Sequence, residues 1–234
     1  MTLQGTAEEA QDQISSGTQQ NKMAQIDLML YKFIEHHQLF EFIEVYKVYL
    51  QGDKRFAEAP ENLGGKTFLH LAVEHNATQI VSYLLLDAKV DPNVLSHNSQ
   101  MGVLHVAVSF QRNDLIDLIL MSEQTTINLM SSLHGTPLHL ACKIGNLKIV
   151  QQLLINGADI SAKSLKNGKL AKDSTDNQRI VFLIEKYEKL RALEQEGEDS
   201  AGSSGEEAEE EVNAQGAAAG TALLNMLKRQ SSQS

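Results

Sequence analysis

The chain lacks the features that define several large classes of protein. It has one cysteine, Cys142, so it forms no intrachain disulfide, which suits a reducing compartment. We interpret Cys142 as a buried core residue and not as a reactive thiol. No apolar run approaches the length that spans a bilayer, and residues 1–13, MTLQGTAEEAQDQ, lack the apolar centre of a secretory signal. We therefore expect a soluble cytoplasmic protein without a membrane span, with the nucleus as a second location.

The composition also lacks an excess of positive charge. The formal net charge is −10, and nine acidic residues lie between Glu194 and Gly220, where there is no lysine or arginine. The remainder of the chain is therefore close to neutral. Because nucleic-acid binding needs a cluster of positive charge, we expect no direct binding of nucleic acid.

The chain does contain a repeated helical unit, which is clearest in residues 135–162, GTPLHLACKIGNLKIVQQLLINGADISA. Thr136 is a helix-capping residue, and Pro137 suits the first helical turn. Gly145 ends this helix at a position that favours a left-handed residue. A second helix follows, with apolar residues on one face, and Gly157 ends it. Such a helix–turn–helix needs neighbouring copies to bury its apolar face.

Two further copies precede this unit. The dipeptide Leu-His recurs at residues 69–70, 104–105 and 138–139, which gives steps of 35 and 34 residues. The apolar positions of the second helix recur in the same register: Ile80, Val81, Leu84 and Leu85; Leu115, Ile116, Ile119 and Leu120; and Ile149, Val150, Leu153 and Leu154. A period of this size indicates an array of structural repeats.

The pattern resembles the ankyrin-repeat family, most fully in the third copy and clearly in residues 65–76, GKTFLHLAVEHN. The resemblance implies an all-α solenoid of stacked helix–turn–helix repeats with hairpin-like turns and disordered termini. It also implies that the recurring histidines bond to the backbone of the neighbouring turn. The residues that match the structural motif of the family are Thr67, Leu69, His70, Leu104, His105, Thr136, Pro137, Leu138, His139 and Gly145.

Composition divides the chain around these copies. We expect repeats at about 62–96, 97–130 and 131–163 and a degenerate unit at 164–193, so that the array covers residues 60–193. Residues 23–53 predict two helices that we interpret as a degenerate N-terminal capping repeat, the alternative being an unrelated helical hairpin. Residues 1–22 and the acidic residues 194–220 are expected to be disordered, and residues 221–234 to form a short helix or tail.

The second copy departs most from the pattern. Gln111 stands where the third copy has Gly145, and Val103 stands where it has Pro137. The first copy has Asn76 at the Gly145 position, and asparagine tolerates a left-handed conformation well. We therefore expect the second repeat to be the least regular of the three.

Residues that suggest catalysis or ligand binding have simpler interpretations. Residues 64–67, GGKT, look like the end of a phosphate-binding loop, but Pro60 stands where that loop needs a glycine. His70, His105 and His139 lie one repeat apart, roughly 10 Å by analogy with packed helices, which is too far for a shared metal ion. We expect no metal, no cofactor and no enzymatic activity.

The resemblance implies a protein-binding module, because repeat arrays present an extended concave surface. In this family that surface is formed by the hairpin tips and the exposed side of the first helices. An exposed aromatic residue such as Phe110 is typical of a binding hot spot, the alternative being that Phe110 packs into the adjacent repeat. We expect a monomeric scaffold or adaptor that binds another protein. The predicted partner-binding residues, carried over by register, are Lys66, Glu74, His75, Met101, Ser109, Phe110, Leu133, Lys143 and Ile144.

Two other functions stay open at this point. An array followed by an acidic tail is similar in layout to the inhibitors that hold transcription factors in the cytoplasm, where the tail would cover a basic partner. The other open function is that of a non-catalytic subunit in an enzyme complex. Candidate phosphorylation sites are Ser203 and Ser204, each with a glutamate three residues later, and Ser231, which follows a Lys-Arg pair closely.

Overall fold

The computed structural model describes residues 19–50 and 65–200, with side chains described for residues 24–48 and 65–192. The chain forms two compact units, residues 1–134 and 135–234. The regular elements of the described residues are helices, joined by turns and isolated β-bridges. This confirms the predicted all-α fold of helix–turn–helix repeats.

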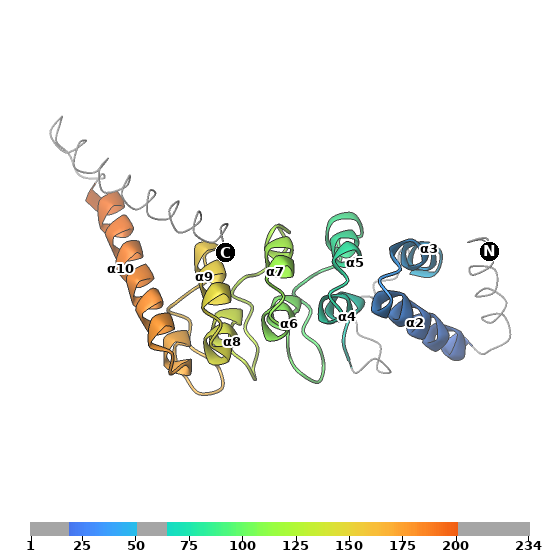
Figure 1. Cartoon of the computed structure of the whole chain (residues 1–234), viewed down its shortest axis with the longest axis horizontal. Coiled ribbons are helices and arrows are strands. Elements are labelled where there is room, and N and C mark those ends of the chain that lie inside the picture. Colours follow the sequence, from blue (N-terminus) through green and yellow to red (C-terminus); the bar gives the residue numbers. More distant parts are fainter. Residues whose placement is uncertain (1–18, 51–64, 201–234) are drawn as a thin grey trace, which may run out of the picture. The chain divides into compact units, whose positions relative to one another are not determined.

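The described part of the first unit consists of three successive helix pairs, coloured blue to green in Figure 1. Within this unit the first helices of the pairs pack against one another, and so do the second helices. The pairs are α2 (Gln19–Glu35) with α3 (Leu39–Leu50), α4 (Phe68–Glu74) with α5 (Thr78–Ser82) and its continuation η3 (Tyr83–Asp87), and α6 (Val103–Ser109) with α7 (Asn113–Leu120).

The N-terminal helix pair packs on the first repeat through its apolar face. The ring centroids of Phe42 on α3 and Phe68 on α4 lie 6.5 Å apart in an edge-to-face arrangement. α2 begins at Gln19, so residues 19–22 are helical and the prediction of disorder there was wrong. Glutamine and lysine are good helix formers and extend the helix toward the N-terminus. The role of this pair as a cap stays our interpretation.

The second helix of the first repeat contains a π-helical turn, η3, whose closing N–H···O bond of 2.9 Å joins residues five positions apart. A π turn accommodates one residue more than an α-helical turn. Lys89, in the left-handed conformation, lies four positions after Leu85, whereas the left-handed Gly157 of the third repeat lies three positions after Leu154. This inserted residue accounts for the longer 35-residue step between the first two Leu-His pairs.

The second repeat is more regular than predicted. α6 and α7 are uninterrupted α-helices, and Gln111 adopts a left-handed conformation with φ 54°, as Gly145 does with φ 82°. The irregular repeat is the first one, because an inserted residue changes the hydrogen bonding of a helix. Gly102 occupies the capping position of the second repeat, where a β-carbon would overlap Cδ2 of Leu129.

The second unit consists, in its described part, of α8 (Pro137–Ile144), α9 (Leu147–Ile155), the 3₁₀ turn η4 (Ala171–Ser174) and α10 (Gln178–Ser200), coloured yellow to orange in Figure 1. α8 packs on α9 and η4, and α10 packs on α9 and η4. Residues of α8, α9 and α10 form its apolar core: Leu138, Ala141, Cys142, Ile149, Val150, Leu153, Leu154, Ile180, Ile184 and Tyr187.

The degenerate last repeat of the second unit keeps the turn but not the motif. Its first helix is reduced to η4, where the N–H of Leu170 donates to the Asp173 carboxylate at 3.2 Å. Its second helix, α10, continues to Ser200. Residues 194–200 are therefore helical, and the prediction that disorder begins at Glu194 was wrong. Glutamate and glutamine in this stretch are good helix formers despite their charge and polarity.

Several predictions concern residues outside the described ranges. These are the disorder of residues 1–18, the GGKT stretch before Gly65, the acidic residues 201–220 and the helix or tail at 221–234. The candidate phosphorylation sites Ser203, Ser204 and Ser231 also lie outside the described residues. None of the helices in the described ranges combines the length and apolar character that a membrane crossing requires.

Candidate partner-binding site

The first helix of the first repeat begins with a hydrogen-bond network around a buried histidine. Nδ1 of His70 lies 2.6 Å from Oγ1 of Thr67 and accepts the N–H of Thr67 at 3.3 Å. Nε2 of His70 lies 2.9 Å from the carbonyl oxygen of Met101, in the turn before the second repeat. Because a carbonyl oxygen only accepts, Nε2 carries the proton and Nδ1 is the acceptor. The neutral ring therefore uses both nitrogens and links two repeats of the first unit.

The other two repeats contain related networks. In the third repeat, Nδ1 of His139 lies 2.8 Å from Oγ1 of Thr136, and Nε2 lies 3.0 Å from the carbonyl oxygen of Lys169. In the second repeat, the N–H of Gly102 donates to Nδ1 of His105 at 3.4 Å. All these imidazoles are buried, and the described residues contain no group of three side chains placed to hold a metal ion.

Burial keeps His70 neutral. Desolvation lowers the pKa of this imidazole to about 4, and the bond to the carbonyl of Met101 offsets part of that effect. The positive charge of Lys66 lowers the pKa further. At neutral pH His70 is therefore a fixed donor and acceptor in the repeat structure, and it has no free nitrogen with which to act as a general base.

A buried serine recurs in the hairpin turns, and the Leu-His motif does not identify it. Ser96, Ser131 and Ser164 recur at steps of 35 and 33 residues, and all three are buried. Their hydroxyl oxygens accept backbone N–H groups of their own turns at 3.2–3.4 Å. The spacing close to the repeat length was the available signal, but serine is common in turns and carries little weight alone.

The predicted partner-binding residues of the first unit include two at equivalent helix ends. His75 and Phe110 directly precede the left-handed residues Asn76 and Gln111, so they occupy the same repeat position. The side chain of Phe110 is 44% exposed, and the neighbouring Ser109 is exposed as well. Phe110 therefore keeps a large apolar surface outside the core of its unit.

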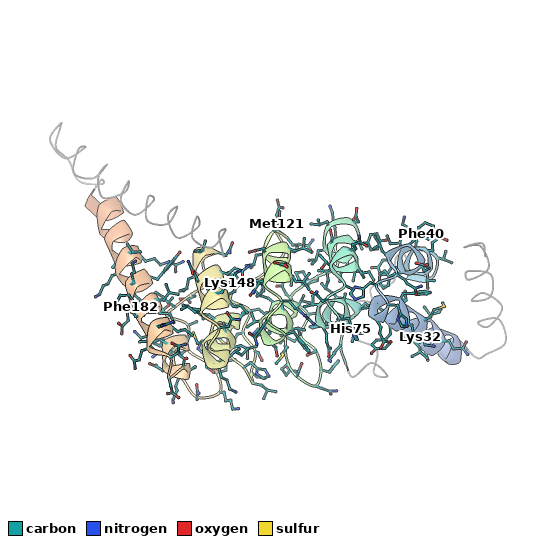
Figure 2. The ribbon with its side chains drawn as sticks, viewed as in Figure 1. Lys32, Phe40, His75, Met121, Lys148 and Phe182 are labelled. Atoms are coloured by element: carbon teal, nitrogen blue, oxygen red, sulfur yellow. The ribbon has the colours of Figure 1, made fainter. Side chains whose placement is uncertain are left out.

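Three predicted residues of the first unit, His75 among them, are engaged in contacts within it. Lys66 and Glu74 form an ion pair and are half-buried. The rings of His75 and Tyr31 lie 5.5 Å apart, edge to face, and Figure 2 shows His75 between α4 and α2. Arg112, which the motif does not identify, donates from Nη2 to the carbonyl oxygen of Glu74 at 3.2 Å. These contacts fix the surface next to Phe110.

The remaining predicted residues lie in turns or at the end of α8. Met101 is half-buried, and Leu133 is exposed. In the second unit, Lys143 and Ile144 end α8 and are both exposed, Ile144 by 36%. Ile144 directly precedes the left-handed Gly145, so it holds in the third repeat the position that Phe110 holds in the second.

Cys142 lies in the core of the second unit. Its side chain is fully buried, and burial raises the pKa of its thiol to about 12. Because the thiolate is the reactive form of cysteine, Cys142 is a poor nucleophile in the folded chain.

Comparison with known proteins places the repeats in a family. The sequence model described as Ankyrin repeats (3 copies) matches residues 30–131 and 69–164, which together cover more than half of the chain. Transient receptor potential cation channel subfamily A member 1 of Homo sapiens is 34% identical over 94 residues, 40% of this chain and 8% of that protein. Putative ankyrin repeat protein FPV014 of Fowlpox virus (strain NVSL) is 32% identical over 95 residues, 41% of this chain and 21% of that protein.

A fungal protein shows a longer but weaker similarity. Ankyrin repeat protein nuc-2 of Neurospora crassa is 29% identical over 126 residues, which are 53% of this chain and 12% of that protein. The chain thus spans between 8% and 21% of the length of these relatives.

Proposed function

Because the chain belongs to the ankyrin-repeat family, whose repeats are generally protein–protein interaction modules, we propose that it is a non-catalytic module that binds a protein partner. The family is typically non-catalytic. We place the binding surface at the exposed ends of the first helices, in each unit separately.

The observation that carries this proposal is the exposure of Phe110. The six residues of α6 that precede Ser109 are all buried, so the core of the second repeat is complete without Phe110. Full burial of a large apolar side chain stabilises a protein by about 1.5–3 kcal/mol. Because the side chain of Phe110 is 44% exposed, it contributes only part of that free energy. A partner that covers this ring recovers that free energy.

Ile144 supports the same interpretation in the second unit. It ends α8 as an exposed apolar residue at the equivalent repeat position, with the cationic Lys143 beside it. In the first unit Phe110 has the small polar Ser109 beside it. Apolar anchors surrounded by polar residues are the usual composition of binding hot spots. The partner therefore presents apolar side chains to these positions.

The site can be located with a peptide ligand and backbone amide signals. Peptides that bind the full chain are selected from a random display library and titrated into isotope-labelled protein. We expect the amide signals of residues 109–111 to shift on binding. Those around Met121 serve as an internal control, because Met121 is an exposed apolar residue at the end of α7. Ligands that shift the signals around Met121 and leave residues 109–111 unchanged would contradict the proposed location.

A further inference from the structure

The charge of the chain is unevenly divided between its parts. Residues 1–134 contain eight Lys and Arg residues against sixteen Asp and Glu residues. Residues 135–192 contain ten Lys and Arg residues against five Asp and Glu residues. The near-neutral charge of the chain outside residues 194–220 therefore combines a negative charge in residues 1–134 with a positive charge in residues 135–192, which the acidic stretch 194–211 follows directly.

Part of this positive charge forms one face of α10. Arg179, Phe182, Lys186 and Lys189 are all exposed, and steps of three, four and three residues place them on one side of a helix. The core residues of α10, such as Ile180 and Ile184, lie on the opposite side. We call the four exposed residues the basic face. Phe182, labelled in Figure 2, is 68% exposed among these cations.

The acidic side chains near the basic face compensate its charge only in part. Glu188 bonds to Lys172 at 3.0 Å and 3.1 Å, and neither residue belongs to the face. The carboxylate of Asp173 accepts the N–H of Leu170. Glu185 is exposed on α10 and lies at the edge of the face by helical spacing. Asp176, three residues before Arg179, is exposed as well, so the three cations of the face outnumber these two exposed carboxylates.

We propose that residues 206–212 of the same chain bind the basic face of α10 as an intramolecular ligand. This segment, EEAEEEV, carries five glutamates and no lysine or arginine. Its negative charge complements the positive charge of Arg179, Lys186 and Lys189. The binding shields the basic face from other acidic molecules.

The length of the chain permits this contact. At 1.5 Å per residue, α10 places Lys189 about 16 Å and Arg179 about 32 Å back from Ser200. An extended chain reaches about 20 Å in the six residues to Glu206 and about 36 Å in the eleven residues to Glu211. This reach is sufficient for Glu206 to meet Lys189 and for Glu211 to meet Arg179 when the segment binds.

The chain's own segment also has an advantage over a separate acidic partner. A short tether gives it an effective concentration in the millimolar range. The attraction is between exposed charges, so it is screened over a Debye length of about 8 Å at physiological ionic strength. The contact is consequently a reversible one that salt weakens, and it is distinct from the partner binding proposed for Phe110.

A spin label in the acidic segment tests this inference in the full chain. The substitution Ala208→Cys provides the attachment site, because Cys142 is buried and does not compete for the reagent. At about 0.01 M salt we expect the label to broaden the amide signals of residues 179–189. At about 1 M salt, where the Debye length is about 3 Å, we expect those signals to recover.

Charge variants identify the surface that binds. The triple substitution Arg179→Gln, Lys186→Gln and Lys189→Gln removes the cations of the basic face, and the broadening should disappear. The matched triple substitution Lys143→Gln, Lys148→Gln and Lys163→Gln removes three other exposed cations of the same unit and should leave it unchanged. Replacing the five glutamates of residues 206–211 with glutamine should also abolish it.

Three results would overturn the inference. The first is an absence of broadening at residues 179–189 at low salt. The second is broadening that persists when the basic face has lost its cations. The third comes from a mixture of spin-labelled chain with isotope-labelled chain that carries no spin label: broadening in that mixture would mean that the segment binds a second copy.

Discussion

The buried histidines show how a single side chain sets the register of a repeat. In His70 one nitrogen accepts from the capping residue of its own helix, and the other donates to a carbonyl of the next turn. Protonation would place a second N–H opposite the N–H of Thr67, so the network requires the neutral ring. The network therefore ties the stability of the first unit to pH.

The pH dependence of stability has a definite sign. The pKa of His70 is lowered from 6.5 to about 4 on folding, so between these values the unfolded chain binds more protons than the folded chain. The contribution of His70 to the free energy of unfolding is therefore fully present above pH 6.5, and it falls as the pH decreases toward 4. Between pH 7 and pH 5 we expect this residue to contribute a loss of about 2 kcal/mol in the free energy of unfolding, at about 1.4 kcal/mol per pH unit.

Chemical denaturation at the two pH values measures this loss. The variant His70→Gln is the comparison, since it lacks the titrating ring and should show a smaller difference between pH 7 and pH 5. Equal differences in the two proteins would mean that His70 does not titrate differently in the folded and unfolded chains.

The core leucine of the third repeat gives a second residue-scale prediction. Leu138 is 1% exposed, and Leu138→Ala is expected to lower the free energy of unfolding by about 2–5 kcal/mol, the range for a core leucine. Leu165 in the same unit is 70% exposed, so Leu165→Ala should change it by no more than about 0.5 kcal/mol. Denaturant unfolding curves that show similar changes for both variants would contradict the assigned register.

At the scale of the element, one inserted residue distinguishes the first repeat. The extra residue is held in the π turn of residues 83–87, and the apolar residues before it keep their buried positions. Deleting Leu86, which is exposed, should therefore convert the π turn into α-helix and change the free energy of unfolding by no more than about 1 kcal/mol.

A deletion in a helix without an insertion is the control for this prediction. Removing Gln151 from α9 rotates Leu153 and Leu154, both buried, by about 100° relative to the residues before it. We expect that variant to lose several kcal/mol, as misplacing core leucines does. If the two deletions cost the same in denaturant melts, the π turn does not hold a removable residue.

The elements were predictable where the sequence repeats itself. The apolar positions of α5, α7 and α9 recur in register, so the position of each second helix follows from the other two. The only sign of the π turn in the sequence is the step of 35 residues between the first two Leu-His pairs. The extent of α10 was missed because its acidic composition predicts disorder, although glutamate is a good helix former.

Contacts of the candidate site were less predictable than its position. Helical register places Phe110 and Ile144 at exposed helix ends, where the structure has them. The bond from Arg112 to the carbonyl of Glu74 and the ring contact between Tyr31 and His75 depend on tertiary packing. The residues that make these contacts do not recur from repeat to repeat, so no local sequence pattern predicts them.

At the scale of the whole molecule, the chain combines a repeat array with an unequal distribution of charge. The composition of the whole chain hides this distribution, because the net negative charge of residues 1–134 and the net positive charge of residues 135–192 partly cancel. The apolar helix ends and the basic face of α10 therefore suit different ligands. The proposed protein-binding function rests on the former.

The most direct test of that function measures binding and stability on the same variant, Phe110→Ala, with Met121→Ala as the matched exposed control. We predict that Phe110→Ala weakens the affinity for a selected peptide ligand by about 2 kcal/mol or more, roughly 30-fold. The free energy of unfolding should change by no more than about 0.5 kcal/mol, and Met121→Ala should change neither quantity. The contrary result is a loss of about 3–5 kcal/mol in unfolding free energy with unchanged affinity in the folded protein, which would make Phe110 a core residue and leave the binding surface elsewhere.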